Sequence, residues 1–336
     1  MGAIGFASNA TGGAGGKVIT VSSGKTAGSG TLKDAIDKAN ASTGSTIIRI
    51  NPGVLVDPIK LIVVASNLTI EGVDDSHVLG NVGLEFDFSR GNNIILRNLC
   101  FRSDEACSED AKQRDCIKIL AEAMKTTRQA IWIDRCRFQA YYDMCITSNS
   151  ATAAGRGPLL ITVSNCDFVD ADPTNQYARN HGAIGIHGVG DLKSGNTLAT
   201  ICNNHFRNVR RRSPRCSNGC FTHAFNNVLE LWGAGASTDQ VNGMDSGNGG
   251  RLVAEANWFQ AGGLKAAIHV DGSGATLTVG AAPLQNIYRN GAVPAVAVGA
   301  EIPTADLYAG AGVAPPTPKA MTTGVKDTII AGAGPR

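Results

Sequence analysis

The chain has 336 residues, enough for one large domain or two ordinary ones, and its 30 basic and 28 acidic residues give a net charge of only +2. That balance excludes a strong global field that would attract nucleic acid or membranes, and no stretch approaches the roughly 20 apolar residues that span a bilayer. With 17% charged residues and 41 glycines, the composition is typical of many short strands joined by tight turns, not of a helical bundle.

The first predicted element is a short amphipathic helix over residues 31–41. Thr31 and Asp34 form a capping arrangement at its start. Its apolar face consists of Leu32, Ala35, Ile36 and Ala39. We expect this helix to cover the N-terminal end of the strands that follow, where exposed edges would otherwise pair with another chain.

A repeated strand pattern dominates the middle of the chain. Five alternating segments end in phenylalanine, at residues 94–101, 131–138, 161–168, 199–206 and 252–259, and residues 66–72 look like an earlier turn of the same series. The spacing is too irregular for a strict solenoid repeat but fits coils with a constant core and variable loops. Stacking would place Phe101, Phe138, Phe168, Phe206 and Phe259 in an interior aromatic ladder, and Asn98, Asn165 and Asn203 in an amide ladder at the preceding corner.

The pattern predicts an all-β chain folded as a single right-handed parallel β-helix with a short N-terminal capping helix. A β-sandwich would need regular hairpin signals, and Asn-Gly or Asp-Gly turns are scarce. We expect one domain over residues 1–336. Residues 1–45 form the cap and first strands, residues 46–300 the coils, and residues 301–336 a strap on the exterior.

The nine cysteines leave at least one thiol unpaired in a monomer. Cys136 and Cys166 occupy equivalent places in two repeats, which favours packed free thiols over a bridge. Five others lie in or beside loops and could pair: Cys100, Cys107, Cys116, Cys216 and Cys220. No set of Cys and His residues has zinc-site spacing.

The most informative motif is Arg212-Ser-Pro214, preceded by Arg210 and Arg211 and followed by a His223-Ala-Phe-Asn-Asn run. Taken in order with Gly12-Gly-Ala-Gly-Gly, Asp115-Cys-Ile-Lys-Ile, Ile131-Trp-Ile-Asp and Tyr141-Tyr-Asp143, it resembles the pectate and pectin lyases, a family of polysaccharide lyases. The resemblance extends over nearly the whole chain.

The resemblance implies cleavage of an acidic polysaccharide by β-elimination. The base is the arginine of the Arg-x-Pro motif, here Arg212, and neighbouring cations favour loss of its proton. In the family the substrate carboxylate is neutralised by calcium or by cationic side chains, and Asp115 and Asp143 match the calcium site.

The sequence also departs from the family pattern. Thr147 and Gln113 stand where further calcium ligands belong, Ala183 where a substrate-binding lysine belongs, and Ser217 where the motif has its second arginine. The resemblance therefore implies an unusual substrate, cleaved more slowly when it is bare polygalacturonate than when it is esterified pectin or a capsule-type heteropolysaccharide.

Other candidates come from position in the chain. Arg210, Arg215, His181 and His187 are candidate substrate-binding residues, and Trp232, beside a glycine-rich stretch, is a candidate for stacking on a sugar ring. Asp134 is more typical of a structural carboxylate paired with Arg135 or a backbone amide, and His223 of a corner residue.

Three other functions stay open: a glycoside hydrolase using Asp115 and Asp143, a phage tailspike-type capsule depolymerase, and a glycan-binding β-helix without catalysis. We expect a secreted, monomeric protein with an acidic polysaccharide as partner, or a trimer on a phage virion, and no nucleic-acid or membrane partner. The first residues lack the basic and long apolar regions of a signal peptide, which fits a trimmed form or a protein that stays inside the cell.

Overall fold

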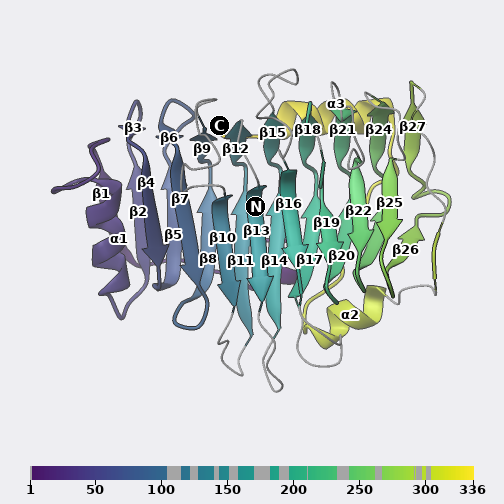
Figure 1. Cartoon of the computed structure of the whole chain (residues 1–336). Helices are drawn as coiled ribbons and strands as arrows, with labels where there is room; N and C mark the ends of the chain where they lie inside the picture. Colours follow the sequence, from purple (N-terminus) through teal and green to yellow (C-terminus); the bar gives the residue numbers. More distant parts are fainter. Residues whose placement is uncertain are drawn as a thin grey trace.

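Each coil of the chain contributes one short strand to each of three parallel sheets, and the stacked coils form a parallel β-helix (Figure 1). The computed structural model describes residues 2–103, 115–121, 128–139, 144–150, 158–169, 182–188, 197–209, 211–232, 242–261, 267–290, 292, 297–299 and 304–336. Every pairing between its named strands is parallel, as the repeated pattern predicts, and the right-handed parallel β-helix is confirmed.

Within the described residues the three sheets have ten, nine and eight strands. The ten-stranded sheet contains β1 (Lys17–Val21), β2 (Thr46–Ile50), β5 (Ser66–Gly72), β8 (Asn92–Arg97), β11 (Gln129–Asp134), β14 (Leu159–Ser164), β17 (Thr197–Cys202), β20 (Phe221–Phe225), β23 (Arg251–Glu255) and β26 (Thr276–Val279). The nine-stranded sheet contains β3 (Leu55–Val56), β6 (Val78–Gly80), β9 (Cys100–Arg102), β12 (Arg137–Gln139), β15 (Asp167–Val169), β18 (His205–Arg207), β21 (Val228–Trp232), β24 (Trp258–Ala261) and β27 (Ile287–Arg289). The eight-stranded sheet contains β4 (Ile59–Val63), β7 (Val82–Asp87), β10 (Asp115–Ala121), β13 (Met144–Ser150), β16 (Gly182–His187), β19 (Arg215–Ser217), β22 (Met244–Gly247) and β25 (Ile268–Asp271).

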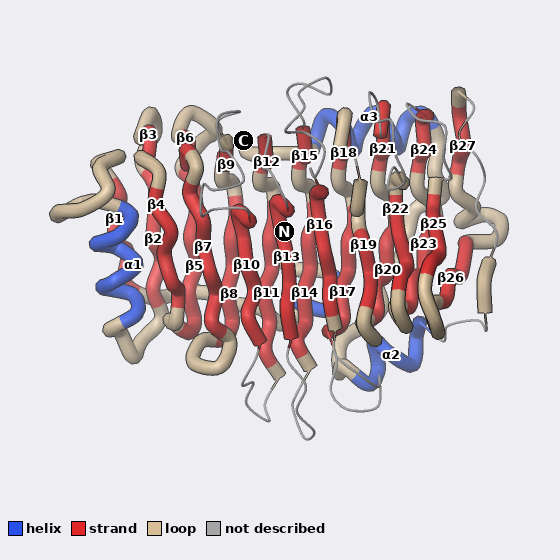
Figure 2. Tube along the Cα trace, in the orientation of Figure 1, coloured by secondary structure: helices blue, strands red, loops and turns tan. Residues whose placement is uncertain are grey.

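Helix α1 (Leu32–Asn40) closes the N-terminal end of the β-helix, as predicted (Figure 2). The Thr31 side chain accepts a hydrogen bond from the Asp34 amide at 3.2 Å. The predicted apolar residues Leu32, Ala35, Ile36 and Ala39 are all buried. They pack into the same core as the first strands of the ten-stranded sheet, so the helix covers the end of the hydrophobic interior.

The aromatic ladder is confirmed over four coils and interrupted in the fifth. Phe101, Phe138, Phe168 and Phe206 stack with ring centroids 5.3, 4.9 and 4.7 Å apart. The next residue in register is Leu229, and only then comes Phe259, which stacks on Tyr288 at 5.3 Å. The long interval between Phe206 and Phe259 therefore contains two coils, and leucine fills the ladder position of the extra one.

The corner asparagines adopt the left-handed backbone that the sequence predicts, with φ of 54°, 54° and 57° at Asn98, Asn165 and Asn203. The amide ladder itself, however, lies one residue further along the chain. It runs through Asn204, Asn227, Asn257 and Asn286, whose side-chain amides bond from coil to coil at 3.0–3.1 Å. The reason is orientation, because the residue after the left-handed corner points into the interior.

Earlier coils place cysteine at the same interior corner position. Cys136 and Cys166 are buried free thiols, as predicted, and the Cys136 amide donates to Cys166 Sγ at 3.4 Å. Of the cysteines predicted near loops, Cys216 and Cys220 form a disulfide, Cys100 is free, and Cys116 is buried. Cys107 lies outside the described residues.

The two ends of the described chain lie against the outside of the sheets. Phe6, in the short 3₁₀ helix η1 (Gly5–Ala7), stacks on Tyr308 of α2 (Thr304–Gly310) with centroids 4.0 Å apart, over the ten-stranded sheet. Helix α3 (Thr323–Gly332) packs on the nine-stranded sheet, where Ile329 joins Val228 and Trp258 in a small cluster. The eight-stranded sheet is not covered by either helix. No helix of the described chain is long and apolar enough to cross a membrane.

Candidate active site

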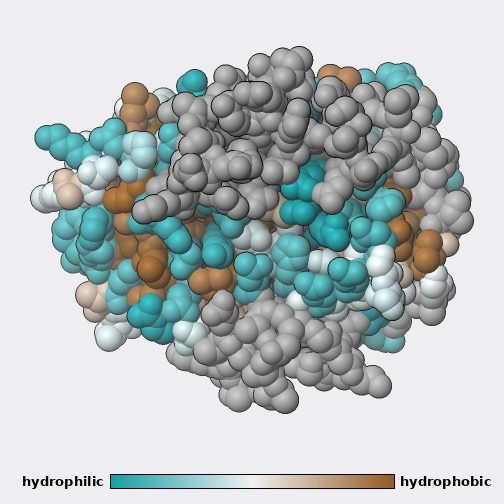
Figure 3. Space-filling model, in the orientation of Figure 1, coloured by the Kyte–Doolittle hydropathy of each residue, from teal (hydrophilic) through white to brown (hydrophobic). Residues whose placement is uncertain are grey.

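Three of the polar candidates, Arg212, Arg215 and His187, lie on the outward face of the eight-stranded sheet. Its backbone register aligns one row of residues across the strands: Glu85, Lys118, Thr147, Gly185, Arg215, Asp245 and His269. Neighbouring strands are about 4.8 Å apart, so adjacent side chains in the row reach each other. Figure 3 shows hydrophobic residues over the first strands and again at the right-hand end of the view, with hydrophilic residues between them.

In the N-terminal part of this row one carboxylate lies between two lysines. Glu85 Oε2 lies 2.8 Å from Lys60 Nζ and 3.9 Å from Lys118 Nζ. Thr147 and Gly185 follow and carry no charge. The next charged residues of the row are Arg215, Asp245 and His269, on β19, β22 and β25.

Arg212 stands at the turn that leads into β19. Its carbonyl oxygen accepts a hydrogen bond from the Ile184 amide at 2.8 Å, which ties the turn to β16. Its guanidinium Nη1 lies 3.8 Å from Met144 Sδ on β13. The half-buried side chain thus extends back across the sheet, and the Arg-x-Pro arginine is held over the outward face.

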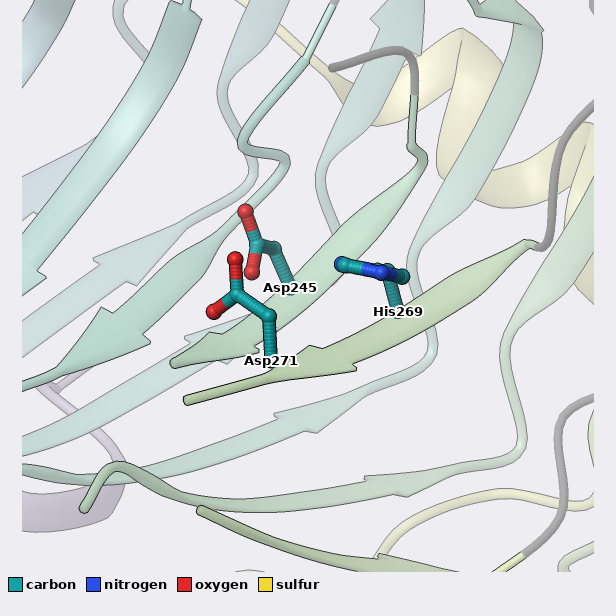
Figure 4. A group of neighbouring side chains, drawn as sticks. All are labelled: Asp245, His269 and Asp271. Atoms are coloured by element: carbon teal, nitrogen blue, oxygen red, sulfur yellow. The ribbon is translucent and has the colours of Figure 1, made fainter. Parts of the chain in front are cut away.

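Arg215 is fixed by two carboxylates from the next two strands. Its Nη1 donates to Asp245 Oδ2 at 2.8 Å, and its Nη2 donates to Asp271 Oδ1 at 3.4 Å. His269 is in register with Asp245. The carboxylates of Asp245 and Asp271 and the imidazole of His269 face one another (Figure 4). Among the described residues, Asp245, His269 and Asp271 form a group able to hold a metal ion, since one ligand atom of each lies within 4.8 Å of the others.

The carboxyl of Asp245 is poorly solvated. Burial raises its pKa above the ordinary value, and the Asp271 carboxylate adds to that effect. The guanidinium groups of Arg215 and Arg212 act in the opposite direction but do not cancel it. Both arginines therefore act on the charge of the same carboxylate, that of Asp245.

His187 and Ser217 are joined on neighbouring strands of the same face. His187 Nδ1 lies 2.7 Å from Ser217 Oγ, and both residues are in register on β16 and β19. Ser217 is the position where the family pattern has its second arginine. Here a hydroxyl and an imidazole occupy that part of the face.

Asp115 is the first residue of β10 and is half-buried, in register with Met144. Its proposed partner Asp143 precedes Met144 in the chain but lies outside the described residues. The candidate substrate-binding residues Arg210 and His181 lie outside them as well.

The expectation that Trp232 stacks on a sugar is not met. Its side chain is 2% exposed and packs edge-on against Phe259, with centroids 6.0 Å apart. The register of β21 shifts between Glu230 and Trp232, and the bulged Leu231 has a φ of 56° and is exposed, so the alternation is broken and the tryptophan turns toward the interior. A ring in the core offers no face to a glycan.

Asp134 and His223 have structural surroundings on the ten-stranded sheet. Asp134 is fully buried, accepts from Ser164 Oγ and Asn165 Nδ2 at 2.8 and 2.7 Å, and pairs with Arg135 at 3.1 Å, as its sequence context predicts. His223 is buried between Tyr308 Oη, at 3.1 Å, and Glu255 Oε1, at 2.8 Å.

Sequence reasoning missed Asp245, His269 and Asp271. A signal was present, because Ile268-His-Val-Asp271 alternates apolar and polar residues as a strand with one polar face. What the sequence did not reveal is that Asp245 occupies the adjacent strand in register with His269.

Comparison with known proteins agrees with this architecture. Residues 1–297 match the family described as pectate lyase. The chain is 29% identical over 286 residues to a pectin lyase of Pectobacterium carotovorum, covering 82% of this chain and 80% of that protein. It is 27% identical over 242 residues to a pectate trisaccharide-lyase of a Thermotoga species, covering 68% of this chain and 57% of that protein.

A solved structure has the same fold. The pectate lyase of Bacillus sp. N165, in complex with trigalacturonate, superposes with a TM-score of 0.62 at 19% identity, covering 99% of this chain and 98% of that one. These findings favour a lyase over the hydrolase, the phage depolymerase and the non-catalytic glycan-binding protein. The chain belongs to the pectate lyase family and is an enzyme of the polysaccharide lyase type.

Proposed function

We propose that this enzyme cleaves a pectin-like polysaccharide containing uronic acids by β-elimination, with Arg212 as the base. The observation that carries the proposal is the position of Arg212, which is held next to Arg215 over the eight-stranded sheet, the sheet that neither α2 nor α3 covers. The 29% identity with a pectin lyase supports the substrate class.

In the proposed reaction, Arg212 removes the proton from the carbon next to the uronate carboxyl group. The electron pair of that C–H bond forms a carbon–carbon double bond, the adjacent C–O bond breaks, and the departing oxygen takes a proton from water. An arginine is normally protonated, so a neutral Arg212 needs surroundings that disfavour another positive charge. Arg211 precedes it directly in the chain and adds a positive charge, and the sequence alone suggests the same role for Arg210.

Arg215 and His187 are the described residues that we assign to substrate binding. Both lie on the outward face, on adjacent strands β19 and β16. Arg215 carries a guanidinium suited to a uronate carboxylate, and its carboxylate partners fix its orientation. Arg210 and His181 complete the proposed set on the strength of the sequence alone.

We assign a calcium ion to Asp115 and Asp143. Oxygen donors are the ligands that calcium prefers, and Thr147 on β13 adds a hydroxyl rather than a third carboxylate. When bound, the ion would help neutralise the substrate carboxylate. A chelator should then lower activity, and Asp143→Asn should have the same effect; full activity in chelator would contradict the assignment.

The proposed preference is for esterified over bare substrate. The middle of the outward row has uncharged Thr147 and Gly185, Ala183 is fully buried, and Ser217 is bonded to His187. The middle of this row therefore offers no charge to bind successive carboxylates. One carboxylate near Arg212 and Arg215 is sufficient for a substrate whose other sugars are neutral or esterified.

Initial rates on polygalacturonate, esterified pectin and a capsule-type heteropolysaccharide test the proposal. Product double bonds are followed by ultraviolet absorbance, and product mass separates elimination from hydrolysis, which adds water. We expect unsaturated products and slower turnover of bare polygalacturonate than of the other two. Saturated products would contradict the lyase chemistry, and fastest turnover of polygalacturonate would contradict only the preference.

We further propose that the chain acts as one catalytic domain, as a monomer, and outside the cell, where acidic polysaccharides of this kind occur. Size-exclusion chromatography with light scattering tests the monomer, and a trimer would contradict it.

A further inference from the structure

Two carboxylates and an imidazole form a cluster in the C-terminal part of the eight-stranded sheet. Asp245 comes from β22, and His269 and Asp271 come from β25. Their ligand atoms lie within 4.8 Å of one another, and in Figure 4 the two carboxylates approach each other while a nitrogen of the imidazole ring faces them.

A buried oxygen without a partner points to a ligand at this place. Asp245 is 5% exposed, and its Oδ1 has no hydrogen-bond partner among the described residues, whereas its Oδ2 accepts from Arg215. A buried carboxylate oxygen that makes no bond is costly, and native structures rarely contain one without a reason. A bound cation at Oδ1 would remove that cost.

Arg215 orients both carboxylates but bonds only one oxygen of each. It contacts one oxygen of Asp245 and one of Asp271, so the second oxygen of each is available to an ion. Hydrogen bonds of this kind commonly hold ligating carboxylates in place around a metal. The two carboxylates carry one more negative charge than the single guanidinium that contacts them, which favours a cation at this place.

The donor set identifies the class of ion. Calcium and magnesium take oxygen ligands, whereas a mixed imidazole and carboxylate set suits zinc and other divalent transition metals. We propose that Asp245, His269 and Asp271 bind a divalent transition-metal ion such as Zn²⁺. Three protein ligands leave a coordination position open, as in zinc sites that accept water or substrate.

This site is separate from the proposed calcium site. Strands β13, β16 and β19 lie between β10, which carries Asp115, and β22, so the two sites are about 19 Å apart at the usual strand spacing. The ion would lie beside Arg215 on the same outward face, where its open position can take a carboxylate of an acidic glycan.

Isothermal titration of the chelator-treated, full-length protein with ZnCl₂ tests the proposal, and it does not depend on lyase activity. We expect one ion to bind, with affinity reduced at least about tenfold in His269→Gln and in Asp245→Asn. His269 is only half-buried, so its substitution should leave the fold intact, which circular dichroism and the melting temperature check.

Matched controls separate this site from the others. His187→Gln and Asp115→Asn should bind Zn²⁺ as the wild type does, and excess CaCl₂ should not displace it. No binding by the wild type, or unchanged affinity in folded His269→Gln, would overturn the proposal. Loss of binding in Asp115→Asn would assign the ion to the first site instead.

Discussion

Two polar clusters in this molecule are arranged in opposite ways. In the corner amide ladder of Asn204, Asn227, Asn257 and Asn286, each side-chain oxygen accepts from the backbone of the previous coil and each side-chain nitrogen donates. In the carboxylate cluster on the eight-stranded sheet, Asp245 retains a buried oxygen without a partner among the described residues. Complete pairing is typical of a cluster that stabilises the fold, and incomplete pairing of one that awaits a ligand.

The comparison predicts that interior substitutions change stability and that outward ones change activity.

The largest effect should come from Phe168→Ala. Phe168 is fully buried between Phe138 and Phe206, so truncation should lower the free energy of unfolding by about 3–5 kcal/mol. Urea denaturation measures the change, and Phe168→Leu should lose much less. A loss below about 1 kcal/mol would contradict the stacked interior.

Arg212→Lys tests the outward face. Lysine cannot reproduce the forked guanidinium geometry, so the rate should fall about 100-fold or more, while the melting temperature stays close to that of the wild type. Steady-state kinetics and calorimetry measure the two. Arg90→Lys, at a largely exposed arginine, is the control and should retain activity. Near-normal turnover by Arg212→Lys would remove Arg212 from the mechanism.

Asn227→Ala breaks the amide ladder in its middle. The amides of Asn204 and Asn257 would each lose a partner in the interior, so the free energy of unfolding should fall by about 1–3 kcal/mol. Activity per folded molecule should be unchanged. Asn9→Ala, at an exposed asparagine, is the control for stability. An equal loss of stability in both variants would show that the ladder contributes nothing.

The smallest effect concerns a buried histidine on the nine-stranded sheet. Burial lowers the pKa of His205, but hydrogen bonds to Asp167 and Glu230 outweigh it, and the net direction is upward. Arg137 pairs with Asp167, and Lys326 and Arg207 act on Glu230. Protonated His205 therefore contributes to the free energy of unfolding. This contribution is fully present below about pH 6.5, the ordinary pKa of histidine, and is lost as pH rises through the raised pKa of the folded state.

The melting temperatures of the wild type and His205→Gln, compared from about pH 5.5 to about pH 9, test this sign. The advantage of the wild type should be greatest at the acidic end and should shrink as pH rises. An advantage that grows with pH would show that His205 is buried in its neutral form.

Much of the fold could be predicted from local pattern. The register of residues 94, 131, 161 and 199 is the one that the repeated segments imply, and the capping helix and the free Cys136 and Cys166 follow from the same kind of reasoning. The coil over residues 221–232 escaped detection because Leu229 replaces the phenylalanine that marked the others. Trp232 was misplaced because a nearby glycine-rich stretch does not show which face of its strand a residue occupies.

The sequence by itself determined the repeated strand, its left-handed asparagine corner and the Arg212-Ser-Pro motif, because these depend on residues that are neighbours in the chain. Only the tertiary structure decided which side chains meet across coils. Asp245 and His269 become adjacent because the intervening coil length brings β22 and β25 into register. In a parallel β-helix the strands carry a local signal, but a site on its face depends on how each coil is stacked upon the last.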